Sequence, residues 1–199
     1  MLVGLDFDNT IACYDKAISA LAEELPNLPS DLPRTKLALR DFLRRTNRES
    51  EWTAFQGALY GPGMAYAQPF EQALESLQEL KDSGHSLCIV SHRSLRPYAG
   101  PAYDLHAAAR GWAEKWLSSA GLIEDRAVFF HETREQKIAA IDALHCKVFL
   151  DDLPEVIEDA AFPGSCKAVL FDPEDSHAES NHLRVSCWAE FPQILARLS

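Results

Sequence analysis

The sequence predicts an α/β fold in which helices flank a parallel sheet. Short apolar runs recur along the 199 residues, helical patterns separate most of them, and the helical patterns end near glycines or polar breaks. Strands that alternate with helices in this way are typical of a parallel sheet covered on both faces. The expected strands are Leu2–Phe7, Ser86–Val90, Ala127–Phe130, Lys147–Leu150 and Ala168–Phe171. The expected helices between them are Phe70–Lys81, Ala107–Ala120 and Thr133–Leu144.

The first expected strand ends in two acids, Asp6 and Asp8. Side chains two residues apart on a strand point to the same side, so the two carboxylates lie close together. Like charges at this spacing repel unless a cation or a shared proton relieves them. A solvated strand end is the alternative interpretation, but polar residues at the ends of other strands favour a functional site.

A long helical stretch follows these acids and interrupts the alternation. It is too long for a single crossover helix, and prolines and glycines divide it, which predicts an inserted helical cap. Ordinary helical decoration is the alternative. The expected domains are an α/β core of residues 1–12 and 69–199 and a cap of residues 13–68. The expected cap helices are Lys16–Glu24, Thr35–Arg45 and Glu51–Tyr60.

Polar residues also follow two later strands. Ser91, His92 and Arg93 follow the second expected strand, and Asp151 and Asp152 follow the fourth. Parallel α/β sheets bind ligands beyond the carboxyl ends of their strands. We therefore expect these residues to meet the acids of the first strand, although they are far apart in sequence.

The residue types at this edge suit phosphoryl transfer. Asp6 offers a carboxylate nucleophile, and Asp8 can protonate a leaving oxygen and later deprotonate water. Thr10 can hold the turn after the strand. Ser91 can donate to a phosphate oxygen, although a lone serine there is also a common turn former. Lys137, near the amino end of a helix, can add positive charge, although most helical lysines are solvated.

Acidic oxygens at the same edge predict a metal. Asp6, Asp8, Asp151 and Asp152 supply the hard ligands that Mg²⁺ prefers, and the ion would neutralise charge on a transferring phosphoryl group. We expect His92 and Arg93 to contact the rest of an anionic substrate.

In order, these residues resemble the haloacid dehalogenase (HAD) superfamily, whose members are mostly phosphatases. The resemblance extends over the whole layout and rests on four motifs: Asp6, Asp8 and Thr10 in D-x-D-x-T, then Ser91, then Lys137, then Asp151-Asp152. It implies a Rossmann-like core with Asp6 as nucleophile and Asp8 as acid/base. It also implies Mg²⁺ held by Asp6, the main-chain carbonyl of Asp8 and one acid of the last motif, with Asp152 favoured and Asp151 assisting. Asn9 stands where glycine is common, and its tolerance of unusual backbone angles makes this departure harmless.

Composition limits the partners. A formal net charge of −11 argues against nucleic acid or an anionic membrane as the partner. No apolar run approaches the roughly 18 residues needed to span a bilayer, and no signal peptide is recognised. The five cysteines are scattered without a C-x-x-C pair, which fits a reducing cytoplasm.

The predicted function is a cytoplasmic, Mg²⁺-dependent phosphatase of a small phosphorylated metabolite. A phosphotransferase or mutase of the same superfamily and a non-catalytic binding module on the same scaffold are the alternatives. Asp8 argues against a true dehalogenase, which lacks the second aspartate. The sequence makes no prediction of the oligomeric state.

Overall fold

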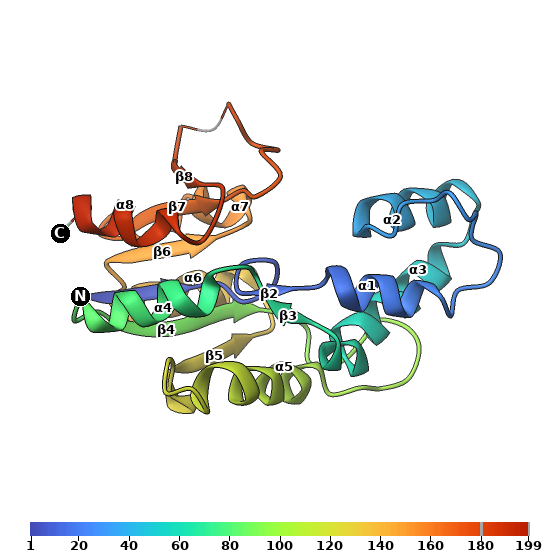
Figure 1. Cartoon of the computed structure of the whole chain (residues 1–199), viewed down its shortest axis with the longest axis horizontal. Helices are drawn as coiled ribbons and strands as arrows, with labels where there is room; N and C mark the ends of the chain where they lie inside the picture. Colours follow the sequence, from blue (N-terminus) through green and yellow to red (C-terminus); the bar gives the residue numbers. More distant parts are fainter. Residues whose placement is uncertain (180, 199) are drawn as a thin grey trace. The chain divides into compact units, whose positions relative to one another are not determined.

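A six-stranded parallel sheet forms the core of the fold, in the order β5-β4-β1-β6-β7-β8 (Figure 1). The computed structural model describes residues 1–179 and 181–198. The sheet confirms the predicted α/β class. Its strands are β1 (Leu2–Leu5), β4 (Ser86–His92), β5 (Val128–His131), β6 (Val148–Asp151), β7 (Lys167–Phe171) and β8 (Leu183–Val185). Two further short strands, β2 (Ala12–Cys13) and β3 (Gln68–Pro69), pair with each other.

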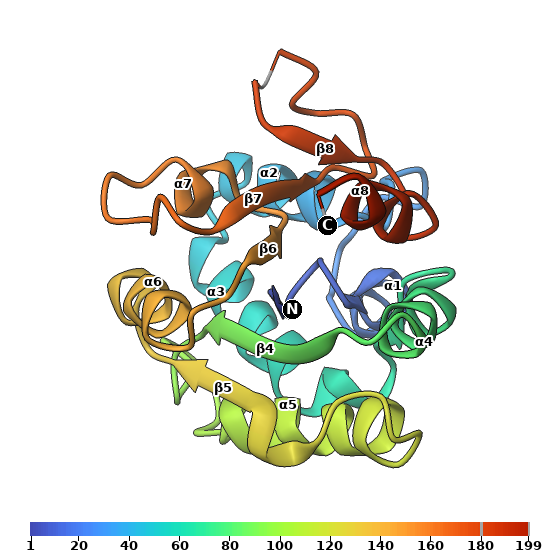
Figure 2. The ribbon, with the colours of Figure 1, turned by 90° about the vertical axis from the view of Figure 1, so that its left-hand side faces the viewer.

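Helices cover both faces of the sheet. Figure 2 shows α6 and α7 on one face and α4 and α8 on the other. The helices are α1 (Asp15–Ala22), α2 (Lys36–Arg45), α3 (Glu49–Tyr60), α4 (Ala73–Asp82), α5 (Leu105–Ala113), α6 (Arg134–Ala143), α7 (Pro154–Ile157) and α8 (Glu190–Leu198). Within the part of the chain that the structure describes, no helix combines the length and apolar character needed to cross a membrane.

The central strand β1 positions the site. It lies between β4 and β6, and its side chains Val3 and Leu5 are fully buried. A Cβ atom on Gly4 would lie 2.5 Å from the ring of Phe149 on β6, so this position requires glycine. Because the three strands run in parallel, the residues that follow Leu5 meet the carboxyl ends of both neighbours.

Some elements differ from the sequence-based expectation. Strand β1 ends at Leu5 rather than Phe7, and β4 continues to His92. The sequence patterns did not predict β8, α7 or α8. Strand β8 has only three residues, too few to show alternation, and α8 contains Pro192. Proline is tolerated here because the first turn of a helix has no internal partner for its N–H groups.

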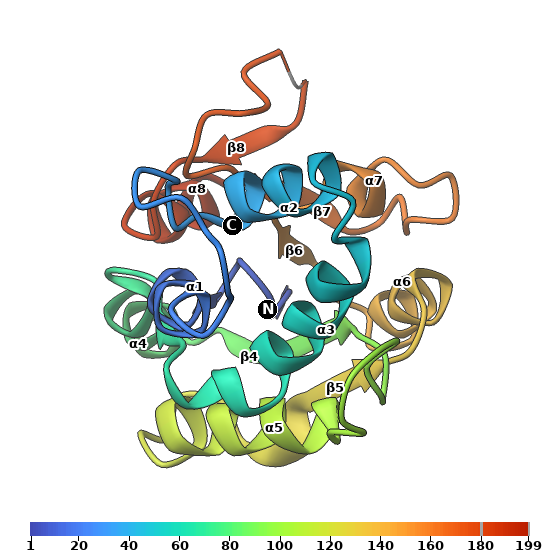
Figure 3. The same ribbon diagram turned by 90° about the vertical axis from the view of Figure 1, so that its right-hand side faces the viewer.

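The chain divides into two compact units, Met1–Ala12 with Pro69–Arg93 and Ala113–Ser199, and Cys13–Gln68 with Ser94–Trp112. The second unit contains α1, α2 and α3 (Figure 3). The predicted boundaries assigned residues 94–112 to the core, whereas the structure groups them with 13–68. A Cβ atom on Gly57 of α3 would lie 2.7 Å from Cβ of Pro97, so the missing side chain lets this segment pack directly on the helix. That this unit acts as a cap stays a prediction.

Candidate active site

Asp6 lies at the centre of a buried polar cluster in the first unit. It directly follows β1 and is only 3% exposed. Its Oδ1 accepts hydrogen bonds from Ser91 Oγ at 2.8 Å and from Lys137 Nζ at 2.6 Å. Its Oδ2 accepts a longer one from Thr10 Oγ1 at 3.3 Å. Two donors from distant parts of the chain and one from the adjoining turn thus fix the orientation of this carboxylate.

The turn after β1 brings Thr10 back to Asp6. The N–H of Ala12 donates to the carbonyl of Phe7 at 2.9 Å, and Asn9 adopts a left-handed φ of 57°. Asparagine tolerates this conformation better than most residues, as expected from the sequence. Trp188 Nε1 donates to the carbonyl of Thr10 at 2.9 Å and anchors the turn.

Lys137 is fully buried between two acids. Its Nζ lies 2.6 Å from Asp6 Oδ1 and 2.6 Å from Asp151 Oδ2. Helix α6 presents it from its first turns, after Thr133 accepts the N–H of Gln136 and caps the helix. Burial alone would lower the pKa of Lys137, but the charges of Asp151 and Asp6 raise it above its ordinary value. Both acids therefore favour the charged form of the lysine.

Asp151 and Asp152 complete the cluster from the end of β6. Asp151 is fully buried, and its Oδ1 accepts the N–H of Leu153 at 3.0 Å. Burial raises the pKa of the Asp151 carboxyl to about 7, and the charge of Lys137 opposes this shift only in part. Asp152 is more accessible, and its Oδ1 lies 3.5 Å from Thr10 Oγ1.

The acidic cluster fits a hard divalent cation. One carboxylate oxygen from each of Asp6, Asp151 and Asp152 lies within 4.8 Å of the others. Three carboxylates face a single ammonium group, so the cluster has an excess of negative charge. Oxygen ligands at this spacing suit Mg²⁺, which is smaller than Ca²⁺ and takes few protein ligands. The chemistry of the donors therefore matches the predicted metal.

The remaining predicted residues lie at the end of β4 and beside it. Arg93 Nη1 is 3.6 Å from Asp8 Oδ1, and the two side chains are 5% and 19% exposed. His92 occupies the last position of β4, in register with His131 of β5. Burial, followed by the charge of Lys137, lowers the pKa of His92 and favours its neutral form.

The structure thus brings Asp6, Thr10, Ser91, Lys137 and Asp151 into direct contact, with Asp152 near Thr10. Sequence reasoning missed Trp188, and it also missed Ser76, whose Oγ donates to the carbonyl of Trp188 at 3.0 Å. These residues show no local pattern that links them to the first strand.

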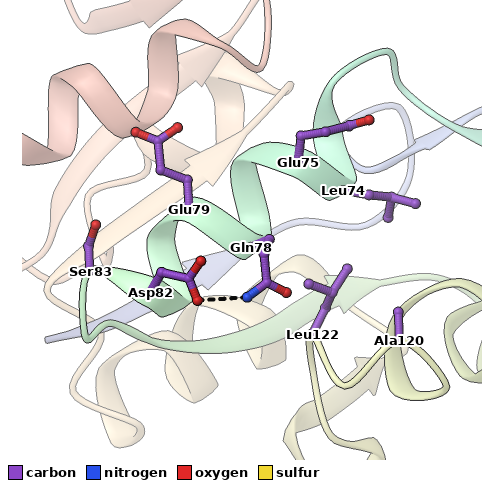
Figure 4. Close-up of a pocket in the computed structure, with 8 residues that line it drawn as sticks. All are labelled: Leu74, Glu75, Gln78, Glu79, Asp82, Ser83, Ala120 and Leu122. Atoms are coloured by element: carbon purple, nitrogen blue, oxygen red, sulfur yellow. Dashed lines mark hydrogen bonds between the residues drawn. The ribbon is translucent and has the colours of Figure 1, made fainter.

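A surface groove lies elsewhere in the first unit. In Figure 4, Leu74 and Gln78 of α4 face Ala120 and Leu122, and Gln78 donates to Asp82. The labelled residues include none of the predicted site residues. The buried cluster around Asp6 is therefore the candidate active site.

Comparison with known sequences gives a distant relative. No family model matches the chain. A protein of Bacillus cereus named "Putative nucleotidase" is 26% identical over 130 residues, which are 65% of this chain and 61% of that protein. The chain thus spans about three fifths of the length of this relative.

Comparison with solved structures gives many matches to the whole chain. A "putative HAD-hydrolase" of Bacillus subtilis bound to magnesium is 14% identical, covers 98% of this chain and 97% of its own, and has a TM-score of 0.62. A "predicted phosphatase" of Clostridium acetobutylicum is 16% identical, with 98% of both chains covered and a TM-score of 0.60. Protein Tyrosine Kinase A of Mycobacterium tuberculosis is 16% identical, with 98% and 97% covered and a TM-score of 0.64. The chain has the fold of the HAD-superfamily hydrolases, as the resemblance of its motifs implied.

Proposed function

We propose that the protein is a Mg²⁺-dependent phosphatase that transfers a phosphoryl group to Asp6 and then hydrolyses the aspartyl-phosphate. One observation carries this proposal: a buried carboxylate is held by Ser91 and Lys137, while two further acids lie within 4.8 Å. Carboxylates grouped in this way repel one another unless a cation balances their charge. A carboxylate that is held in one orientation is suited to attack phosphorus.

In the first step, a carboxylate oxygen of Asp6 attacks the phosphorus atom of the substrate. The Asp6 oxygen–phosphorus bond forms as the bond from phosphorus to the ester oxygen breaks. Asp8 gives a proton to the departing oxygen, so the product leaves as a neutral alcohol. Ser91 and Lys137 keep Asp6 in one orientation, which lowers the entropic cost of reaching the reactive geometry.

In the second step, Asp8 takes a proton from water as the water oxygen bonds to phosphorus. The Asp6 carboxylate departs and inorganic phosphate is released, which restores both aspartates. Asp6, the main-chain carbonyl of Asp8 and Asp152, with Asp151 assisting, would hold Mg²⁺, and the bound ion would supply positive charge against the transferring phosphoryl group. The contact between Asp151 and Lys137 supports giving the more accessible Asp152 the direct role.

The substrate is a small phosphorylated metabolite, and nucleoside monophosphates are the first class to examine. The name of the Bacillus cereus relative supports this choice. With a formal net charge of −11, the protein attracts an anionic substrate only where cations are concentrated locally. Lys137 and the bound metal would supply such cations at the site.

The test is phosphate release from nucleoside monophosphates, sugar phosphates and small organic phosphates, measured with Mg²⁺ and with EDTA. A signal that requires Mg²⁺ and disappears in Asp6→Asn supports the proposal. Phosphoryl transfer to an added alcohol without net hydrolysis would instead favour a phosphotransferase. Folded protein without turnover or Mg²⁺ binding would favour a binding module.

A further inference from the structure

Arg93 lies in an unusual position for a residue that binds a substrate. It is 7% exposed as a whole residue, although it lies beyond the carboxyl end of β4. Its Nη1 is 3.6 Å from Asp8 Oδ1, and its guanidinium carbon lies 5.8 Å from the ring centres of both Phe7 and Phe130. The guanidinium is thus directed at the side chain of Asp8 from a partly apolar cage.

The backbone of Arg93 is fixed by the sheet. After β4 ends at His92, the N–H of Arg93 still donates to the carbonyl of His131 at 2.8 Å. Ser91 and Arg93 are two residues apart, so their side chains leave the strand on the same side. Ser91 contacts Asp6 and Arg93 contacts Asp8, which are also two residues apart. The end of β4 therefore supplies one polar partner to each aspartate of the first motif.

The two aromatic rings restrict the guanidinium further. Phe7 and Phe130 contact each other edge to face, with ring centres 5.4 Å apart. Cations within about 6 Å of an aromatic ring centre are attracted by its electron density. Because the rings come from the loop after β1 and from β5, they hold the planar group between two rigid parts of the core.

We propose that Arg93 is a positioning residue that holds the carboxylate of Asp8 in the orientation needed for proton transfer, rather than a group that binds the substrate. This inference rests on the proposed phosphatase function, in which Asp8 protonates the leaving oxygen. A misplacement of about 1 Å in a reacting group can cost about 10²-fold in rate, so a residue that acts through the carboxylate of Asp8 can control turnover.

The inference predicts a dependence on the leaving group. An alkyl phosphate needs a proton from Asp8 as its oxygen departs, whereas p-nitrophenolate is a stable anion and leaves without one. Attack by Asp6 does not involve Arg93. Loss of Arg93 should therefore slow the first step for alkyl esters and spare it for p-nitrophenyl phosphate. The second step, in which Asp8 takes a proton from water, should slow for both.

The experiment compares wild-type protein with Arg93→Met on two substrates, an alkyl phosphate that wild-type protein cleaves and p-nitrophenyl phosphate. The rates are measured in the steady state and by stopped flow. We expect kcat for the alkyl ester to fall about 10²-fold with little change in KM. With p-nitrophenyl phosphate, we expect a burst of p-nitrophenol close to the enzyme concentration, followed by slow turnover. Asp8→Asn should give the same pattern, and the double variant should be no slower than Asp8→Asn alone.

Three controls keep the test decisive. Arg93→Lys retains a cation and should recover part of the lost rate. Phe130→Leu removes one ring and should give a weaker form of the same selective loss, which also serves if Arg93→Met does not fold. Arg126→Met changes an arginine whose side chain is 84% exposed and should leave the kinetics unchanged.

The possible failures are distinguishable. A rise in KM with kcat unchanged would show that Arg93 binds substrate, and an equal loss for both esters without a burst would show a general structural role. Either result overturns this inference while the phosphatase function stands. Wild-type protein that hydrolyses neither ester overturns the proposed function, and this inference with it.

Discussion

Two clusters of acids stand at the carboxyl ends of neighbouring strands, and they are built differently. The cluster after β1 and β6 groups three carboxylates, of which Asp6 and Asp151 contact the single ammonium of Lys137. The cluster after β7 places Asp172 and Asp175 around the guanidinium of Arg184. Both hold more acids than cations, three to one in the first cluster and two to one in the second, but they differ in how many further donors satisfy the buried acid.

In the β7 cluster, backbone and side-chain donors satisfy the buried acid. Asp172 Oδ1 accepts the N–H of Ser176 at 2.9 Å, and its Oδ2 accepts the N–H of His177 at 2.9 Å and Arg184 Nη1 at 2.8 Å. Burial raises the pKa of Asp172, but Arg184 and the two N–H groups outweigh it, and the pKa lies below its ordinary value. This cluster organises a loop.

The pKa shifts of the buried acids in the two clusters have opposite directions. The pKa of Asp151 is raised by burial, whereas that of Asp172 is lowered by its donors. Perturbed acids that lack sufficient donors are typical of functional sites, while fully satisfied acids are typical of structural ones.

The largest expected effect is the loss of turnover in Asp6→Asn. An amide cannot form the aspartyl-phosphate, so we expect kcat to fall by about 10³-fold or more. Asp172→Asn is the matched control, and it should keep wild-type kcat. Phosphate release by both variants, together with circular dichroism, measures the contrast. Equal losses of kcat would remove the distinction between the two clusters.

Lys137→Met should cause the largest loss of stability. It removes the only cation that the structure shows in contact with both Asp6 and Asp151, and leaving buried charge unpaired costs about 3–5 kcal/mol in unfolding free energy. Urea unfolding at pH 8 measures this loss. Lys147→Met, which changes an exposed lysine at the start of β6, should alter stability by no more than about 0.5 kcal/mol. A similar, small effect in both variants would contradict the charge imbalance that we infer.

Much of the first cluster could be predicted from the sequence, because strand ends are local features. Apolar runs followed by Asp6, Ser91 and Asp151 place these residues at one edge of any parallel sheet. The sequence predicts that Lys137 adds positive charge to the site, and the structure adds its contacts with Asp6 and Asp151. The roles of these residues in catalysis stay predictions.

Contacts over long sequence separations could not be predicted. Trp188 anchors Thr10 across 178 positions, and no local pattern marks such a pair. The grouping of residues 94–112 with the helical insertion depends on the close approach of Pro97 to Gly57. Such an approach depends on the absence of one side chain, and the hydrophobic pattern does not record it.

Magnesium should stabilise the protein through the first cluster alone. At about 100 times its dissociation constant, a ligand adds about 2.7 kcal/mol to the unfolding free energy. We expect this gain in wild-type protein and in Asp172→Asn, and its loss in Asp152→Asn. Thermal unfolding with Mg²⁺ and with EDTA measures it. A gain that persists in Asp152→Asn would assign the metal to other ligands.

The gain from magnesium should also depend on pH. The pKa of Asp151 is raised to about 7, so its contribution to metal-free stability is present below pH about 4 and lost as pH rises through about 7. A divalent cation requires the ionised carboxylate, so its apparent affinity should rise from pH 6 to pH 8. Titration calorimetry at several pH values checks this, and a pH-independent affinity would contradict it.

The smallest expected effect is on the β7 cluster, and its pH dependence has the opposite sign. Asp172→Asn weakens charge-assisted hydrogen bonds to Arg184 and to two N–H groups, which should cost about 2 kcal/mol at pH 7. Because the pKa of Asp172 is lowered in the folded state, its contribution is present above pH about 4 and lost as pH falls through the folded pKa. The difference in unfolding free energy between wild type and variant should therefore shrink in acid. A difference that instead grew in acid would mean that Asp172, like Asp151, is buried without enough donors. The two clusters would then not differ in how their buried acids are satisfied.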